Sequence, residues 1–500
     1  MQPEARKGED CWIGVDLGTQ SVRVLAVSAA GTVLGSGRSS LESVRNGARH
    51  EQDPRHWWNA VTDACTQATA ALRGTIRGVA VDATSGTVLL GGRPGQNLTP
   101  GLMYDDTRAA VESERVNDAG QDLFRRLGYQ KVQSSWGLPK AVWLVENAPG
   151  NTPFRILHQG DFINELLTGA PVASDLSSSL KTGCDLQAGC WPQDLMTALG
   201  LREEVLPGLV LSGTVLGQVC ARAAEATGIP AGTPVIAGMT DGCAAQLGSG
   251  ALAPGAWNSV IGTTLVLKGA TEQLLQDPSG VVYSHRGPDG GWLPGGASGT
   301  GAGYITRRLP GRDLDTLSAE AHRHLPARVV TYPLASAKGE RFPFVAPDAS
   351  AFTVGRTGSD AELYAALIQG ISFVERLAFD HLQSLGAPTG GPLVLTGGAA
   401  RSRSWSQLRA DVLGRPVTLV KNAEPALGMA ILAASAGSGS LAETAAAMVT
   451  VDEVLDPEPG TTAKYMEPYL QLVSELRSRN WLGTTLANHA RDNAQEAAAA

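Results

Sequence analysis

The chain has 500 residues, a formal net charge of −8 at pH 7 and a hydrophobic fraction of 43%, values ordinary for a folded protein of two domains. The acidic balance and the lack of Lys/Arg runs argue against nucleic-acid binding. No apolar stretch is long enough to predict a membrane span, and the polar residues 1–10 predict no secretory signal. The six cysteines are scattered without a C-x-x-C pair, which favours reduced thiols. We therefore expect a cytoplasmic protein.

The first half of the chain opens with two short apolar runs, residues 12–15 and 22–27. They predict two strands joined by the turn Asp16-Leu17-Gly18-Thr19-Gln20-Ser21. Apolar residues at helical spacing then predict a helix over residues 54–72, and a buried strand follows over residues 76–81.

The second half repeats this order. Residues 257–261 and 264–267 flank the turn Gly262-Thr263, and a helical apolar face is followed by a strand over residues 392–395. The apolar positions of that helix are Leu363, Leu367, Ile371, Val374 and Ala378. We therefore predict two duplicated α/β domains with a boundary within residues 230–250. The Ala-rich residues 488–500 predict a frayed helix end or a disordered tail.

The first turn carries groups suited to phosphate and metal. Backbone N–H groups near Gly18 and the hydroxyls of Thr19 and Ser21 can donate to phosphate oxygens. Asp16, at a strand end, offers the oxygen ligand that Mg²⁺ prefers. Taken alone, such a turn is more often an ordinary polar hairpin. It is neither a Rossmann fingerprint nor a Walker A loop, because a second strand follows the turn and no G-x4-G-K-[ST] occurs.

A second motif is Gly238-Met239-Thr240-Asp241-Gly242, which follows an apolar run at residues 234–237 and opens a predicted helix. A carboxylate at Asp241 could accept the proton of an attacking hydroxyl. An Asp at this position can also simply cap the helix. The motif alone leaves both interpretations open.

Two further turns belong to the second half. Gly262-Thr263-Thr264 offers hydroxyls that suit a γ-phosphate, and Gly397-Gly398-Ala399-Ala400 follows a strand. Glycines there could let the backbone approach an adenine or a ribose closely, or could simply form a turn.

Together these pieces resemble the FGGY family of carbohydrate kinases from Trp12 to about Ala434. The matching stretches, in order, are G-V-D-L-G-T-Q-S-V-R (14–23), H-E-Q-D-P-x-x-W-W (50–58), M-Y-D-D-T-R (103–108), D-F-x-x-x-L-L-T-G (161–169), G-M-T-D-G (238–242), I-G-T-T (261–264), G-E-R-F-P (339–343), T-G-G-A-A-R-S (396–402) and A-D-V-L-G-R-P-V (410–417). The resemblance implies an α/β fold of two ribonuclease-H-like domains of the actin/hexokinase superfold, with ATP and sugar meeting in a cleft between them.

The resemblance also assigns roles to single residues. Asp241 corresponds to the family's catalytic base and Asp16 to the carboxylate on the magnesium side. The expected phosphate and ATP contacts are Gly18, Thr19, Gln20, Gly262, Thr263, Thr264, Gly397, Gly398, Ala399 and Asn422, with Glu424 and Gly428 in the segment that closes the adenosine pocket. Ala399 stands where the family more often has Gly.

The expected sugar contacts are Asp82, Thr84, Ser85, Asp106, Arg108 and Asp241. For Asp106 and Arg108, orientation of the sugar or its loop competes with a plain surface ion pair. Tyr283-Ser284-His285 and Gly295-Gly296-Ala297-Ser298 are similar to the pattern of D-ribulose kinases related to xylulokinases; without that resemblance His285 reads as an ordinary structural histidine. Trp57 and Trp58 are predicted to be packing residues.

We therefore expect residues 1–240 to form the sugar-binding domain and residues 241–500 the ATP-binding domain of a kinase that uses ATP and Mg²⁺. The expected substrate is a ketopentose, D-ribulose or D-xylulose, phosphorylated at a terminal hydroxyl. Glycerol, L-ribulose and gluconate remain alternative substrates. A non-kinase ATPase or a sugar-sensing repressor of the same superfold remains a rival. We expect no nucleic-acid or membrane partner, and a homodimer is left open.

Overall fold

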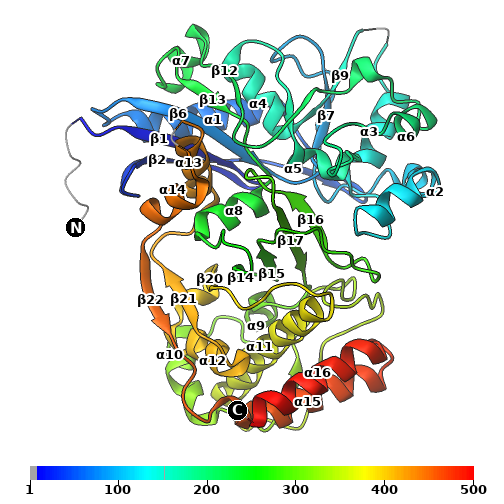
Figure 1. Ribbon diagram of the computed structural model, residues 1–500, viewed down its shortest axis with the longest axis vertical. Helices are drawn as coiled ribbons and strands as arrows, with labels where there is room; N and C mark the ends of the chain where they lie inside the picture. Colours follow the sequence, from blue (N-terminus) through cyan, green and yellow to red (C-terminus); the bar gives the residue numbers. More distant parts are fainter. Residues whose placement is uncertain (1–7, 151, 438, 500) are drawn as a thin grey trace. The chain divides into compact units, whose positions relative to one another are not determined.

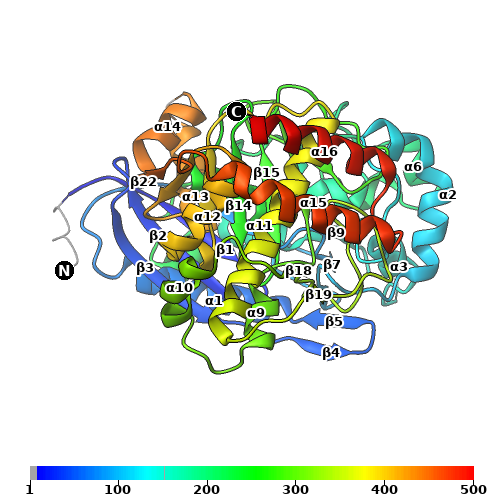
Figure 2. The ribbon, with the colours of Figure 1, turned by 90° about the horizontal axis from the view of Figure 1, so that it is seen from below.

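The computed structural model describes residues 8–150, 152–437 and 439–499, and they form two compact units (Figures 1 and 2). Unit 1 comprises the described residues of 1–250, 285–293 and 422–450, and unit 2 those of 251–284, 294–421 and 451–500. The units are thus not consecutive stretches, because a late segment packs with the first half of the chain. The division predicted after residue 240 stays a prediction for the domain limits.

Unit 1 is built on a six-stranded sheet in the order β12-β13-β6-β1-β2-β3. β1 pairs antiparallel with β2 and parallel with β6, which in turn runs parallel to β13. The predicted strand–turn–strand is therefore present. The bounds are β1 Cys11–Leu17, β2 Ser21–Ser28, β3 Val33–Ser40, β6 Ile76–Ala83, β12 Val215–Gln218 and β13 Pro234–Ile236.

Helices pack on this sheet through apolar faces. The predicted helix is α1 (Pro54–Thr69), which begins after the N-cap Asp53 and buries Trp57 completely. Close backbone packing joins α13 to β1, since a Cβ at Gly14 would lie 1.8 Å from the carbonyl oxygen of Ala426. The helices of this unit are α1, α2 Ala110–Arg126, α3 Gly137–Glu146, α4 Gln159–Thr168, α5 Leu176–Ser179, α6 Gln193–Ala198, α7 Ala221–Thr227, α8 Asp241–Ser249, α13 Pro425–Ser435 and α14 Leu441–Met448.

Unit 1 also holds a five-stranded sheet that the sequence patterns did not predict. Its order is β4-β5-β8-β7-β9, and its strands are only two to four residues long, too short to carry a clear period-2 pattern. The bounds are β4 Val44–Asn46, β5 Arg49–Gln52, β7 Val88–Gly91, β8 Gly101–Leu102 and β9 Arg155–His158; β10 Ser174–Asp175 pairs separately with β11 Leu209–Val210.

Unit 2 repeats the central topology of unit 1. In its seven-stranded sheet, β16-β17-β15-β14-β20-β21-β22, β14 pairs antiparallel with β15 and parallel with β20, which runs parallel to β21. This is the arrangement of β1, β2, β6 and β13, so the predicted duplication is confirmed. The bounds are β14 Trp257–Ile261, β15 Leu265–Gly269, β16 Tyr283–Arg286, β17 Trp292–Ala297, β20 Leu393–Thr396, β21 Val417–Val420 and β22 Val451–Leu455, with the pair β18 Val330–Tyr332 and β19 Phe352–Val354 outside the sheet.

The helical apolar face predicted around Leu367 belongs to α11 (Asp360–Ser384), which is buried along most of its length. The expected frayed tail is instead helix α16 (Thr484–Ala499), which buries Leu486, Ala487, Ala490 and Ala494 in the core of unit 2; Ala500 lies outside the described residues. The tail is ordered because small alanines pack closely. The remaining helices of unit 2 are α9 Ala302–Arg308, α10 Leu314–Ala321, α12 Arg403–Leu413 and α15 Thr462–Ser478.

Within the described residues, no helix combines the length and the apolar character that a membrane crossing requires.

Candidate active site

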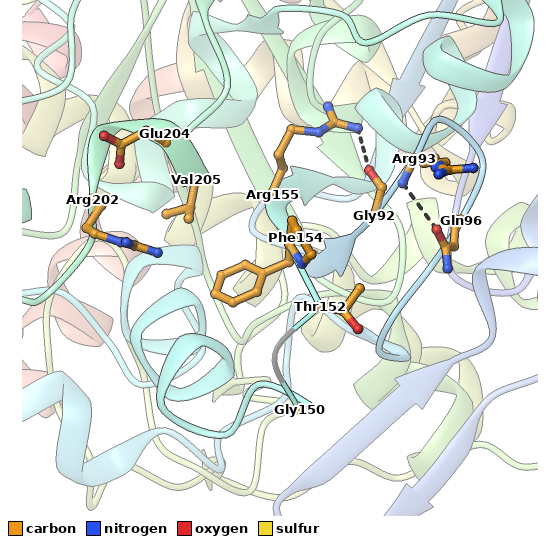
Figure 3. A pocket seen from close by; sticks show the side chains of 11 residues that line it. Gly92, Arg93, Gln96, Gly150, Thr152, Phe154, Arg155, Arg202, Glu204 and Val205 are labelled. Carbon is orange, nitrogen blue, oxygen red and sulfur yellow. Dashed lines mark hydrogen bonds between the residues drawn. The ribbon is translucent and has the colours of Figure 1, made fainter.

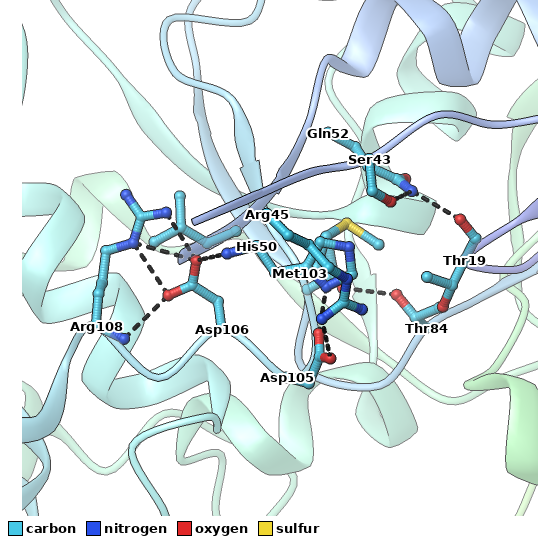
Figure 4. A network of polar contacts seen from close by, with 12 residues as sticks. Thr19, Ser43, Arg45, His50, Gln52, Thr84, Met103, Asp105, Asp106 and Arg108 are labelled. Carbon is cyan, nitrogen blue, oxygen red and sulfur yellow. Dashed lines mark hydrogen bonds and ion pairs between the residues drawn. The ribbon is translucent and has the colours of Figure 1, made fainter. Parts of the chain in front are cut away.

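The β1–β2 turn is fixed from outside by hydrogen bonds to its carbonyl groups. The N–H of Leu41 donates to the oxygen of Gln20 (2.8 Å). Nε2 of Gln52 donates to the oxygen of Thr19 (2.7 Å) and to Oγ of Ser43 (2.8 Å), as Figure 4 shows. Oε1 of Gln52 accepts from Nε1 of Trp57 (2.6 Å). Gln52 thus ties the turn to α1, a role that sequence reasoning missed although Gln52 lies in the H-E-Q-D-P stretch.

Three predicted carboxylates come together at one end of the unit 1 sheet. Asp16 and Asp82 are register partners on the parallel strands β1 and β6. Asp241 follows directly on Thr240, which bridges to Ala83 at the end of β6. Burial and the charge of Asp241 raise the pKa of Asp16 to about 7, although Arg23 acts in the opposite direction. Burial, followed by the charges of Asp16 and Asp241, raises the pKa of Asp82 well above its usual range.

Asp241 is the first residue of α8, and the N-cap is Thr240. The interpretation of Asp241 as the cap is therefore wrong. The carboxylate is half-buried, and its Oδ1 accepts from the N–H of Gly242 (2.7 Å). The motif begins with a glycine because the backbone of Gly238 packs closely on β6: a Cβ there would lie 1.9 Å from the carbonyl oxygen of Val81. No atom lies within 4 Å of a Cβ placed at Gly242, so the helix start faces open space.

The last residues of β6 and those that follow it carry buried polar side chains with unused hydrogen-bonding capacity. Among the described residues, the buried Oγ of Ser85 has no hydrogen-bond partner. The buried carboxyl of Asp82 has only the carboxyl of Asp16 beside it. Thr84, by contrast, is satisfied: its Oγ1 lies 2.6 Å from Oγ1 of Thr87 and 2.7 Å from Oε1 of Gln159. The end of β6 therefore presents unmet hydrogen-bonding capacity.

Asp106 and Arg108 form an ion pair, which is buried and not on the surface. The Nη2 of Arg108 lies 2.7 Å from Asp106 and 2.7 Å from Glu51, and the guanidinium stacks 5.0 Å from the Trp143 ring. Asp106 also accepts from the N–H of His50 (2.7 Å; Figure 4). Both side chains are thus engaged with β5 and α3. This geometry favours a role in ordering their loop, and direct sugar contact stays a prediction.

In unit 2, the turn after β14 is closed by the N–H of Gly262, which donates to the oxygen of Thr264 (3.0 Å). The N–H groups of Ala302 and Gly303 donate to the oxygens of Gly262 (3.0 Å) and Thr263 (3.1 Å). The side chain of Thr263 is exposed. A fixed turn with an exposed hydroxyl suits contact with a phosphate.

The loop after β20 lies beside this turn. Gly397 has a φ of +82°, and a Cβ there would lie 2.7 Å from the oxygen of Ile261, the last residue of β14. Glycine is therefore required by the protein's own packing. Gly398 is exposed and a Cβ there would meet nothing within 4 Å. Ala399 is only 5% exposed and belongs to the core, so its methyl packs inward.

Four further predicted residues fall in unit 1. Asn422 is exposed and precedes α13. Oε1 of Glu424 accepts from Arg23 (3.4 Å), whose strand position pairs with Asp16. Gly428 serves helix packing, since a Cβ there would lie 2.0 Å from the oxygen of Ala244 in α8. His285 is buried at 3% exposure.

A cavity of about 1020 Å³ in unit 1 contains none of the predicted residues (Figure 3). Its walls include Arg93, Arg155 and Arg202. Arg155, however, pairs with the buried Glu165 and donates to the oxygen of Gly92 (3.0 Å). Its charge is therefore already compensated, and we do not place the active site there.

Comparison with known proteins decides the family. The model of the FGGY family of carbohydrate kinases, N-terminal domain, matches residues 11–248, and that of the C-terminal domain matches residues 257–437. The chain belongs to this family. It is therefore a sugar kinase with the two-domain, actin/hexokinase-like α/β fold expected for these enzymes.

Individual relatives support this assignment. A xylulose kinase of Streptomyces coelicolor is 30% identical over 441 residues, which cover 85% of this chain and 88% of that protein. The structure of ligand-bound xylulose kinase from Lactobacillus acidophilus aligns with a TM-score of 0.85 at 21% identity, over 94% of this chain and 98% of that one. Glycerol kinase of Plasmodium falciparum with ADP gives 0.82 at 18% identity, over 94% and 99%.

Proposed function

We propose that this FGGY kinase transfers the γ-phosphoryl group of ATP to a terminal hydroxyl of a ketopentose, D-ribulose or D-xylulose. The observation that carries the proposal is the polar end of β6, where Asp82 and Ser85 bring buried atoms without partners beside Asp241. Unpaired buried polar atoms are costly unless a ligand satisfies them. The similarity to a xylulose kinase over most of the chain supports the same substrate class.

Asp241 would act as the general base. Its carboxylate is half-buried at the start of α8, beside open space at Gly242, so an attacking hydroxyl could reach it. As the hydroxyl oxygen attacks the γ-phosphorus, its proton would pass to the carboxylate and the bond to the ADP oxygen would break. Burial first, and then the charge of Asp241, raise the pKa values of its neighbours Asp16 and Asp82, so protons are held readily beside the proposed base.

Asp16 is our candidate for the magnesium side. Among the described residues, no group of three or more His, Cys, Asp or Glu side chains is arranged to hold a metal by itself. Magnesium in phosphoryl-transfer sites commonly uses one or two carboxylates together with phosphate oxygens and water. The converging carboxylates at Asp16 fit that pattern. When bound, the ion would neutralise charge on the β- and γ-phosphates.

The turns would hold the phosphates. In unit 1, the carbonyls of Thr19 and Gln20 are tied back to the protein and the N–H of Gly18 donates to the oxygen of Ser21 (3.2 Å). The hydroxyl of Thr19 is then the proposed phosphate donor of this turn. In unit 2, the turn at Thr263 and the neighbouring loop at Gly398 are proposed to contact the nucleotide. Fixed donors aimed at developing charge need no reorganisation during transfer.

The test is a coupled assay of ADP release over a panel of D-ribulose, D-xylulose, L-ribulose, glycerol and gluconate. We expect at least about a 10-fold higher kcat/KM for a D-ketopentose than for glycerol, because a three-carbon polyol leaves one or two of these polar groups unpaired. Between the two pentuloses we favour D-ribulose, on the resemblance at Tyr283-Ser284-His285.

Other outcomes separate the alternatives. Glycerol or gluconate as the best substrate would refute the ketopentose and leave the kinase intact. ADP release that no sugar stimulates would instead favour an ATPase without a sugar acceptor.

A further inference from the structure

Gln159, the first residue of α4, is fully buried beside Thr84, one of the predicted sugar contacts. Its Oε1 accepts from the backbone N–H of Thr84 (3.1 Å) and from Oγ1 of Thr84 (2.7 Å). A backbone N–H can only donate, so the oxygen of the amide must face Thr84 and the orientation of the amide is fixed. The NH₂ group is thereby directed away from Thr84.

This NH₂ group has no hydrogen-bond partner among the described residues, and its nitrogen is buried. The same holds for Oγ of Ser85, and the buried carboxyl of Asp82 has only the carboxyl of Asp16 as a neighbour. Each unsatisfied buried group costs about 1–3 kcal/mol. All three belong to segments joined at Thr84, since Asp82 and Ser85 flank it in sequence and Gln159 binds it directly. Their shared need for partners points to one polar ligand.

The chemistry of the three groups defines that ligand. The amide nitrogen of Gln159 can only donate. The carboxyl group of Asp82, whose raised pKa favours its protonated form, and the hydroxyl of Ser85 can each donate and accept. Sugar hydroxyls match such a mixed set because each one both donates and accepts.

We propose that Nε2 of Gln159 donates a hydrogen bond to a secondary hydroxyl or the carbonyl oxygen of the sugar, and so helps to select the substrate. This inference rests on the proposed ketopentose kinase activity. A purely structural role, in which Gln159 only holds Thr84, is the competing explanation.

The experiment compares Gln159→Met with the wild type on the preferred ketopentose and on analogues that each lack its carbonyl oxygen or one secondary hydroxyl. We expect kcat/KM for the sugar to fall about 10- to 100-fold, the effect of one lost hydrogen bond in a buried site, with the KM for ATP within about twofold. The decisive result is that the variant no longer discriminates against the one analogue that lacks the group bound by Gln159.

Two further variants serve as controls. Gln67→Met removes an exposed glutamine whose amide bonds the backbone of Arg38 (3.1 Å for each bond), and its kinetics should match the wild type. Gln159→Glu keeps an acceptor for Thr84 but loses the donor, so it should show the same selective loss. If Gln159→Met does not fold, the same comparison is made with Gln159→Glu.

The outcomes are distinguishable. If wild-type ADP release is not stimulated by any ketopentose, the proposed function fails and this inference falls with it. If the wild type is active but Gln159→Met and Gln159→Glu keep the full preference for the parent sugar over every analogue, Gln159 only holds Thr84 and the inference is wrong.

Discussion

Two groups of buried carboxylates, one in each unit, differ in how far the protein satisfies them. In unit 2, Glu375 receives two hydrogen bonds from Arg409 (2.8 and 2.7 Å), and both side chains are fully buried. Glu340 accepts from Ser298 (2.8 Å), from the N–H of Gly299 (2.7 Å) and from Tyr332 (2.9 Å). In unit 1, Asp82 is as deeply buried, but the group beside it is another carboxyl, Asp16, and no cation or backbone N–H of the described residues pairs with it.

This contrast separates carboxylates that maintain the fold from carboxylates that we propose for ligand binding. Burying a charge is tolerated when partners satisfy it, as at Glu375. At Asp82 and Asp16 the fold keeps like charges together, which weakens the ligand-free protein. Such a cost is typical of a functional site.

Breaking the satisfied pair should give the largest effect. Arg409→Met leaves Glu375 buried without its cation, and we expect the free energy of unfolding to fall by about 3–5 kcal/mol, measured by urea denaturation. The matched control is Arg403→Met, whose pair with Glu453 is exposed; it should cost less than about 1 kcal/mol. Equal losses in the two variants would contradict the distinction.

In the cluster of Asp16, Asp82 and Asp241, we expect a substitution to lower the catalytic rate without lowering the stability of the fold. Asp241→Asn is expected to lower kcat by about a hundredfold or more, because a general base is lost. The affinity for ATP should stay near that of the wild type, and the Tm should not fall, because the substitution removes one of the repelling charges. Steady-state kinetics with the best sugar and a thermal melt check this. Near-normal turnover would return Asp241 to a structural role.

A smaller effect is expected in the pH dependence of stability. Because the pKa of Asp16 is raised to about 7 by burial and by Asp241, the folded protein holds a proton that the unfolded chain has lost above pH ~4. Stability of the ligand-free protein should therefore fall as pH rises from about 4 to 7. Asp16→Asn should reduce that fall by about 1 kcal/mol or more, in urea titrations at several pH values. If the free energy of unfolding depended on pH in the same way in the variant and the wild type, the pKa of Asp16 would not be raised in the folded protein.

The smallest effect is expected at Asp277 in unit 2. Burial raises its pKa, but hydrogen bonds from His381 and Ser279 outweigh burial and bring it to about 2. The stability that this lowered pKa contributes is present above pH ~4 and is lost as pH falls toward 2. Asp277→Asn should therefore flatten the acid side of the stability curve, by about 1 kcal/mol. If the free energy of unfolding of the variant fell more steeply at acid pH than that of the wild type, the prediction would be wrong.

The sequence predicted those elements whose pattern is local. Apolar runs identified β1, β2, β6 and β14, and helical spacing identified α1 and α11. The resemblance brought Asp16, Asp82 and Asp241 into one hypothesis, and the structure places them at one sheet end.

What could not be predicted depends on contacts distant in sequence. Gln52 and Thr19 are 33 residues apart, and Gln159 and Thr84 are 75 apart. An isolated glutamine carries no sign of its partner. Gly397 was expected to admit a ligand, yet its neighbour is the backbone of Ile261.

The packing of α13 on β1 has a consequence for biosynthesis. Gly14 touches the backbone of Ala426, and Gly428 in turn touches Ala244, so the surface of β1 is covered by a helix that lies about four hundred positions later. A ribosome releases residues in order, and domains generally fold as units during synthesis. The nascent first half must therefore wait, with an apolar strand face uncovered, until most of the polypeptide has emerged. During that interval the uncovered apolar face is a site at which the growing chain can aggregate.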